Sequence, residues 1–207
     1  MLESWLAAWS ALGVERSLEL EALNSELLAR YSEPHRHYHT VQHLKECFER
    51  LEELKPVIPH PAEVEIALWF HDAIYDTRKS DNEMLSAQWA TDAAHTFGAS
   101  KSSATLLHDL VMSTQHAAEP AGLDAEALVD VDLSILGAST DRFAEYEHQI
   151  RQEYSWVAEP LFRSRRAAVL KQFLARPHIY STSMLREQYE ARARANLHHS
   201  LAMLGQE

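Results

Sequence analysis

The chain is poor in cysteine and in basic side chains. Cys47 is the only cysteine among 207 residues, which excludes an intramolecular disulfide and any zinc site built from several cysteines. The 19 Lys and Arg are outnumbered by 31 Asp and Glu, so the formal net charge is −12. This balance excludes an extended nucleic-acid surface, because neutralising a phosphate backbone requires a basic face. One small phosphorylated ligand, held by a metal ion or a few local cations, remains compatible with it.

Long hydrophobic runs are also absent. No apolar stretch approaches the roughly 20 residues that a membrane-spanning helix needs. The first residues, Met1 to Trp5, are acidic and lack the basic and apolar regions of a secretory signal. We therefore expect a cytoplasmic protein with no membrane partner.

The sequence is rich in helical patterning. Apolar residues recur at i, i+3 and i+4 almost throughout, and no Gly/Ser linker or internal repeat divides the chain. We predict an all-α protein with a single domain over 1–207, made of about nine or ten helices. Ser80, three residues before Glu83, predicts a capping box at the start of one of them. The expected helices span about 18–31, 41–54, 64–74, 80–97, 102–114, 124–136, 140–157, 160–174 and 183–204.

Three short segments carry side chains suited to chemistry. His39 and His43 are four residues apart, so they share a face of a helix that begins near Thr40. The alternative is a loop histidine followed by a surface histidine.

A His-Asp doublet, His71 and Asp72, interrupts a stretch that otherwise reads as a buried helix. A buried carboxylate requires a cation or several hydrogen bonds. A metal ion and a structural ion pair with an arginine both satisfy that requirement. In the third segment, Asp130 and Asp132 point about 200° apart on one helix, so only one can face a shared site. Two exposed carboxylates are the alternative.

Taken together, the order His, His-Asp, Asp supplies two imidazoles and two carboxylates. This mixed nitrogen and oxygen set suits Mn, Mg, Co, Ni, Fe or Zn as a divalent metal cofactor. The pattern resembles the HD superfamily of metal-dependent phosphohydrolases, an all-α family named after its His-Asp doublet. The resemblance covers most of the chain, roughly Tyr31 to Ile179, and leaves a C-terminal helix over 183–204.

Local motifs give the resemblance its detail. The segment Tyr38-His39-Thr40-Val41-Gln42-His43 is similar to the Tyr-His-Asn-x-x-His motif of cyclic-nucleotide phosphodiesterases. That likeness implies His43 as a metal ligand and His39 as the acid that protonates the leaving oxygen. The segment Val131-Asp132-Leu133-Ser134 resembles their Ala-Asp-Leu-Ser, which implies Asp132, and not Asp130, as the fourth ligand beside His71 and Asp72.

The segment from His71 to Thr77 resembles the His-Asp-x-x-Glu-Asp-Thr segment of alarmone hydrolases, with Tyr75 in place of their Glu. The glutamine and aromatic clamp of the phosphodiesterases has no clear counterpart. The resemblance therefore implies a metal-dependent phosphohydrolase for a small phosphorylated substrate, a nucleotide or related metabolite, without naming that substrate.

Further residues receive roles around this ligand set. Asp76, one turn after Asp72, is expected to orient the attacking water or to act as base. Two basic clusters next to the ligands, around Arg36 and at Arg78-Lys79, are candidates for holding phosphate oxygens.

His108 and His116 are candidates for substrate contact or a second metal. A second metal would favour a different chemistry, that of an HD-like di-iron oxygenase. The remaining alternative is a non-catalytic helical binding protein that contains the metal.

Overall fold

The computed structural model describes residues 1–116 and 118–205, and over these residues it is all-α. It contains ten α-helices and two short 3₁₀ helices, with no strand in the described residues, which confirms the predicted fold class. None of the described helices is long and apolar enough to cross a membrane. The chain divides into two compact units, Met1–Val131 and Asp132–Glu207. The prediction of a single domain stays a prediction.

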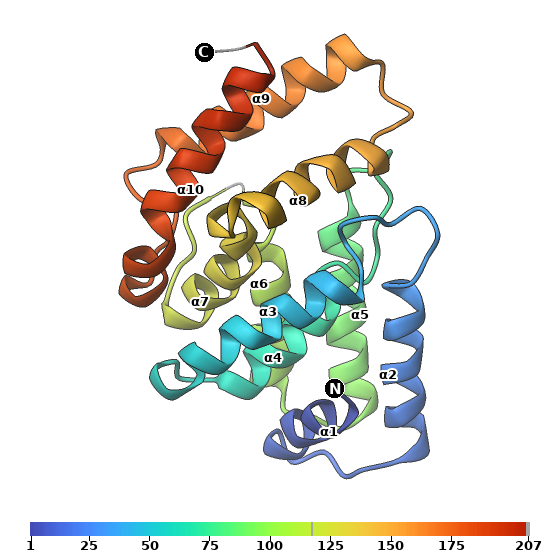
Figure 1. Cartoon of the computed structure of the whole chain (residues 1–207). Helices are drawn as coiled ribbons and strands as arrows, with labels where there is room; N and C mark the ends of the chain where they lie inside the picture. The colour runs from blue at the N-terminus through green and yellow to red at the C-terminus, as the bar shows by residue number, and fades with distance from the viewer. Residues whose placement is uncertain (117, 206–207) are drawn as a thin grey trace. The chain divides into compact units, whose positions relative to one another are not determined.

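The first unit holds most of the helices (Figure 1). They are α1 (Leu2–Ala11), α2 (Leu18–Arg30), α3 (Val41–Leu54), η1 (Lys55–Val57), α4 (Pro61–Phe70), α5 (Asn82–Thr96), α6 (Lys101–Ser113) and α7 (Leu123–Asp132). The last residue of α7 is the first residue of the second unit, so the division falls inside this helix.

Helix α4 is the centre of the first unit. It packs against α1, α3, α5 and α6, and every residue from Val64 to Phe70 is buried. Most of these buried side chains are apolar and the exception, Glu65, pairs with Lys55 at 2.7 Å, so this stretch shows no solvent-facing polar stripe. His71 and Asp72 follow directly on its C-terminal end. A helix that is buried from Val64 to Phe70 therefore leads into the His-Asp doublet.

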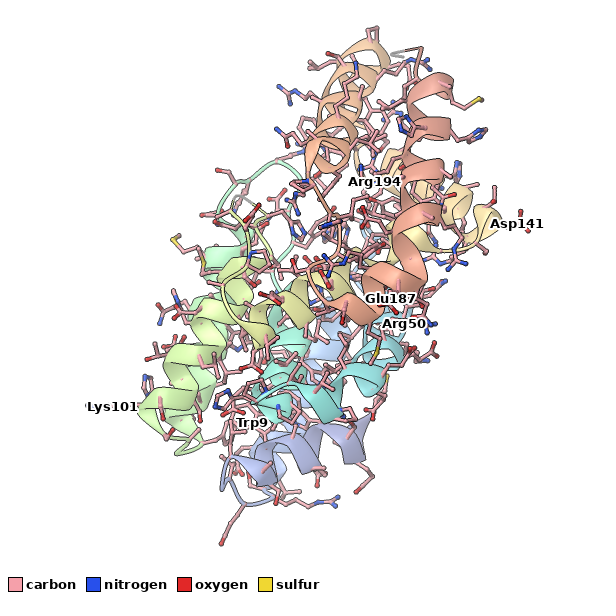
Figure 2. All side chains as sticks on the ribbon, turned by 90° about the vertical axis from the view of Figure 1, so that its left-hand side faces the viewer. Trp9, Arg50, Lys101, Asp141, Glu187 and Arg194 are labelled. Atoms are coloured by element: carbon pink, nitrogen blue, oxygen red, sulfur yellow. The ribbon has the colours of Figure 1, made fainter. Side chains whose placement is uncertain are left out.

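Helix α1 lies outside the helices that the apolar spacing predicts. Trp5 and Trp9 are both fully buried and meet edge to face, with ring centroids 5.4 Å apart; Figure 2 labels Trp9. Trp5 also meets Trp69 of α4 at 5.4 Å. Burial of such large rings stabilises the docking of α1 by several kcal/mol, about 2–3 kcal/mol for each aromatic side chain.

The predicted capping box at Ser80 is wrong. Helix α5 begins at Asn82 with Asp81 as its N-cap, and no side chain caps it. The Asn82 amide instead pairs with the main chain of Asp76: its Oδ1 accepts from the Asp76 N–H at 3.1 Å and its Nδ2 donates to the Asp76 carbonyl at 3.0 Å. These two bonds set where the chain enters α5, which leaves Ser80 exposed.

An ionisable contact joins the start of α4 to the start of α7. His60, the N-cap of α4, donates its main-chain N–H to Asp124 Oδ1 at 2.9 Å, and its Nδ1 lies 2.7 Å from Asp124 Oδ2. The hydrogen bond to Asp124 is the main influence that raises the pKa of His60. The imidazolium form is therefore bound more strongly in the folded chain.

The His60 contact predicts a pH dependence of stability. Because the pKa is raised on folding, its contribution is complete below the pKa of an unfolded histidine, near about 6.5, and is lost as pH rises through the folded value. His60 is half exposed, so we expect the contribution to be at most about 1 kcal/mol. Denaturant unfolding of wild type and His60→Gln should differ more at about pH 5.5 than at about pH 8.5. An equal difference at both pH values would contradict the assignment.

The second unit consists of η2 (Leu133–Gly137), α8 (Thr140–Glu153), α9 (Glu159–Ala175) and α10 (Ser183–Met203). Helix α10 packs against η2 and α9. Asn196 on α10 donates to the Leu136 and Ala138 carbonyls at 2.8 and 3.0 Å, and Arg192 donates to the Gly137 carbonyl. Polar side chains of α10 thus satisfy the carbonyls at the end of η2, which a helix terminus leaves open.

Arg194, labelled in Figure 2, ties α10 to the segment that follows α9. Its guanidinium pairs with Glu190 at 2.7 Å and donates to the carbonyls of Leu174, Arg176 and Pro177 at 2.9–3.1 Å. One side chain therefore closes the connection between the last two helices.

Candidate metal centre

His43 reaches the interior from the first turn of α3. That helix begins after Thr40, whose hydroxyl oxygen accepts from the Gln42 N–H at 3.3 Å. The imidazole is 1% exposed, and Cys47, one turn later, places its Sγ 3.6 Å from His43 Nδ1. Cys47 also donates to the Val131 carbonyl at 4.0 Å. His43 is thus held on the buried face of α3 against the end of α7.

His71 ends α4 with its ring orientation fixed. Its main-chain N–H donates to the Ala67 carbonyl at 2.9 Å, and Nδ1 donates to the Leu68 carbonyl at 2.7 Å. Since a carbonyl only accepts, the proton of the neutral ring is on Nδ1 and the lone pair is on Nε2. A ligating histidine commonly has this arrangement, in which the outer nitrogen bonds to a carbonyl.

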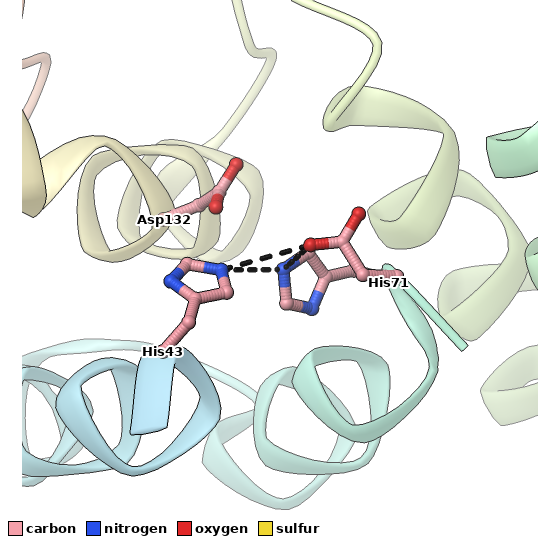
Figure 3. A group of neighbouring side chains, drawn as sticks. His43, His71 and Asp132 are labelled. Carbon is pink, nitrogen blue, oxygen red and sulfur yellow. Dashed lines mark hydrogen bonds and ion pairs between the residues drawn. The ribbon is translucent and has the colours of Figure 1, made fainter. Parts of the chain in front are cut away.

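The lone-pair nitrogen of His71 faces the other donors of the site (Figure 3). His71 Nε2 lies 3.2 Å from His43 Nε2 and 2.9 Å from Asp72 Oδ2, while His43 Nε2 lies 3.6 Å from that same oxygen. Both imidazoles are buried and the Asp72 carboxylate is 18% exposed. Three potential ligand atoms of the first unit therefore converge from α3 and from the end of α4.

Asp132 completes the group. Donor atoms of His43, His71, Asp72 and Asp132 all lie within 4.8 Å of one another. Asp132 is the last residue of α7, whose other nine residues belong to the first unit. Its position therefore follows from the helix that it ends, which contacts α3 through the bond between Cys47 and the Val131 carbonyl.

These residues fit a divalent cation. Two imidazoles and two carboxylates supply two negative charges, and burying them is costly unless positive charge is shared among them. The nitrogen and oxygen donors match the preferences of the metals expected from the sequence. In the described residues no other group of three or more His, Cys, Asp or Glu side chains is gathered in this way. The structure thus assembles the four residues predicted as metal ligands.

The two carboxylates at the C-terminal end of α7, Asp130 and Asp132, differ in burial. Asp130 is completely buried and Asp132 is partly buried. The alternative with two exposed carboxylates is therefore excluded. The sequence pattern did not indicate that Asp130 lies inside the protein.

Tyr31 is a residue of the site that sequence reasoning missed. Its hydroxyl accepts from the Asp72 N–H at 3.3 Å and donates to the Leu68 carbonyl at 3.4 Å. Burial, and then the charge of Asp72, raises its pKa well above the ordinary value, so the phenol stays protonated. The only sequence signal is its place at the end of α2, just before the histidine-rich loop.

His39 lies beside the ligand group rather than in it. Its ring centroid is 5.9 Å from that of His43 and 4.2 Å from that of Tyr75, and the residue is partly exposed. An imidazole in this position is accessible to a ligand next to the metal group. Its role as a proton donor stays a prediction.

Asp76 is held in a tight turn. Its Oδ1 accepts from the Arg78 N–H at 3.0 Å, and its carbonyl accepts from the Lys79 N–H at 3.0 Å. Arg78 and Lys79 are exposed. The structure thus places both cations on the turn after the ligands, and the predicted roles of all three residues remain predictions.

Arg36, a candidate for holding phosphate oxygens, lies inside the protein. Its side chain is completely buried and donates to protein carbonyls and to Glu33. His116 lies after α6, partly buried, with a φ of 54°. His108, on α6, pairs with the adjacent Asp109 at 3.1 Å. Neither histidine belongs to the metal group of the described residues.

Comparisons with known proteins add no family to this description. No protein-family model, no curated protein and no solved structure matches the chain. The class that the fold and site define is therefore an all-helical protein with a buried His/His/Asp/Asp group that can hold a metal ion.

Proposed function

We propose that this protein is a metal-dependent phosphohydrolase, similar in its site to the HD superfamily, that cleaves a small phosphate ester such as a nucleotide or related metabolite. The observation that carries the proposal is the convergence of His43, His71, Asp72 and Asp132 from distant segments. Their order along the chain is the order in which the family's ligands occur. Two carboxylates held beside two buried imidazoles are costly unless a cation offsets their charge.

Each residue around the metal group has a separate role in the proposed reaction. When bound, a divalent ion supplies Lewis acidity, which offsets charge on a phosphoryl oxygen and strengthens water as a nucleophile. His39, beside His43 and partly exposed, donates a proton to the departing alkoxide, because imidazole exchanges protons near neutral pH. Asp76, on the turn after the doublet, orients the attacking water. Arg78 and Lys79, exposed on that turn, attract the phosphate.

The absence of a second donor group in the described residues favours hydrolysis over the di-iron oxygenase. His108 and His116 were the candidates for a second metal, and neither of them joins the ligand group. Two-metal chemistry therefore has no ligand set of its own in this part of the chain.

A metal-stimulated phosphate-release assay tests the proposal. Metal-free protein would be loaded with Mn²⁺ and incubated with a generic phosphate ester and a panel of nucleotides and phosphorylated metabolites, beside elemental analysis of the protein. We expect one metal per chain and phosphate release that disappears with a chelator and in Asp72→Asn. Metal binding without hydrolysis of any ester would favour a binding protein. Two iron equivalents with a visible absorption band would favour an oxygenase.

A further inference from the structure

The buried guanidinium of Arg36 bridges the two loops that carry the site. None of its side chain is exposed, and it reaches from the loop before α3 to the turn after α4. Nη1 donates to the Asp72 carbonyl at 2.6 Å and Nη2 donates to the Ala73 carbonyl at 3.1 Å. Nη1 also donates to the carbonyl of His39 at 3.3 Å. One side chain therefore contacts the main chain of both a metal-ligand residue and the predicted proton donor.

The surroundings of Arg36 match its charge. Nε pairs with the Glu33 carboxylate at 3.1 Å, and the guanidinium carbon lies 5.2 Å from the Tyr31 ring centroid and 5.3 Å from that of Tyr75. Two of the three carbonyls that it contacts, those of Asp72 and Ala73, follow the C-terminal end of α4, where the helix dipole favours a positive charge. Five donors in a planar fork satisfy several acceptors at once, which the single ammonium of a lysine does not.

We propose that Arg36 is a positioning residue, which fixes the position of the His71-Asp72 turn relative to His39. The effect of Arg36 on catalysis rests on the proposed function. Its effect on the position of the turn does not, because that position can be measured in the metal-free protein. Tyr75 lies between His39 and Arg36. Its ring centroid is 4.2 Å from that of His39 and 5.3 Å from the guanidinium carbon of Arg36. His35, next to Arg36, also joins the two loops, because its Nε2 lies 2.9 Å from the Tyr75 carbonyl.

The test compares Arg36→Lys with a matched control. Glu65→Gln removes a buried ion pair with Lys55, 2.7 Å in length, elsewhere in the same unit, and is expected to lower the melting temperature without touching the loops. Nuclear magnetic resonance of the histidine rings in metal-free protein is the primary measurement. We expect the His39 and His71 ring signals to shift in Arg36→Lys and to stay in place in Glu65→Gln.

Metal loading and turnover supply the second measurement. In Arg36→Lys we expect Co²⁺ affinity to fall by about 10- to 100-fold, as for other residues that orient ligands, with a changed cobalt spectrum. The kcat for phosphate release should fall with little change in KM. A rise in KM alone would instead indicate that Arg36 contacts phosphate, and unchanged ring signals with only a lower melting temperature would reduce Arg36 to a structural role. Either result would overturn the inference.

Failure of the proposed function can be distinguished from failure of the positioning role of Arg36. If wild type binds no metal and releases no phosphate, the proposed function fails, while the ring signals still decide the positioning role. If Arg36→Lys does not fold, Glu33→Gln removes the carboxylate at Nε and is expected to shift the same two rings. Unchanged rings in that variant would also overturn the inference.

Discussion

Asp72→Asn is expected to abolish metal binding at the candidate centre. The asparagine keeps the shape of the side chain but removes the charge that lies 2.9 Å from His71 Nε2 and 3.6 Å from His43 Nε2. Since residues that merely orient ligands are worth 10- to 100-fold in affinity, loss of a ligand should cost at least about 100-fold. Phosphate release should fall to the level of metal-free protein.

Thermal unfolding with and without Mn²⁺ measures this loss directly. A ligand that binds only the folded chain at 100 times its Kd stabilises it by about 2.7 kcal/mol. Wild type should therefore gain several degrees in melting temperature on addition of Mn²⁺, and Asp72→Asn should gain none. A full metal-dependent shift and full activity in the variant would eliminate catalysis through this site.

Asp130 and Asp132, near the end of α7, provide a matched pair for the same measurement. Asp132→Asn should lose the metal-dependent shift. Asp130→Asn should keep it, although burial of Asp130 means that the variant is expected to be less stable without metal. Asparagine is the better substitution, because alanine at the buried position would also leave a cavity. The reverse result would assign the fourth ligand to Asp130.

Gly137→Ala is expected to cause the largest loss of stability in the second unit. A Cβ at this position would lie 2.6 Å from Tyr189 Cβ, 2.9 Å from Tyr189 Cδ1 and 3.0 Å from the Tyr180 hydroxyl. Contacts this short force α10 and η2 apart, so the cost should reach or exceed the upper end of overpacking, about 3 kcal/mol. Denaturant unfolding measures the difference in free energy.

The nature of the contact allows a sharp control. Because the nearest atom is the Cβ of Tyr189, Tyr189→Ala should not rescue the variant. Gly98→Ala provides the comparison: its φ of 79° strains any side chain, but nothing lies within 4 Å of the added Cβ. It should cost only about 1–2 kcal/mol. An equal loss of unfolding free energy in Gly137→Ala and Gly98→Ala would contradict the predicted clash at Gly137.

Much of the helical framework could be predicted from the sequence, because it follows from local periodicity. In the α3 segment apolar residues recur every three or four positions, and both ends of the helix, at Val41 and Leu54, match the expectation. Helix α1 was missed because its tryptophans were not recognised as a buried face. The start of α5 was misplaced because Asn82 pairs with Asp76, a contact that a capping pattern does not encode.

The candidate site also contains residues that the sequence predicts and residues that it does not. His71 and Asp72 are neighbours in sequence, and the other two ligands were placed through motif resemblance, so the group itself was expected. The roles of Tyr31 and Arg36 were not, because both depend on long-range bonds to main-chain carbonyls. Such bonds leave no spacing pattern in the sequence, since any residue offers a carbonyl. Arg36, next to a ligand motif, was therefore interpreted as an anion contact, whereas its side chain is buried against main-chain carbonyls.

The bond between His71 Nδ1 and the Leu68 carbonyl joins residues only one helical turn apart. The contact that leaves the lone pair on Nε2 is therefore made with α4 itself and does not involve α3 or α7. Asp72 is the next residue, but its main chain is held by long-range bonds from Tyr31 and Arg36. The orientation of one of the four donors is thus set before an ion binds, which reduces the entropy lost on loading. The folding of a single helix end thus performs part of what would otherwise be required of the ion.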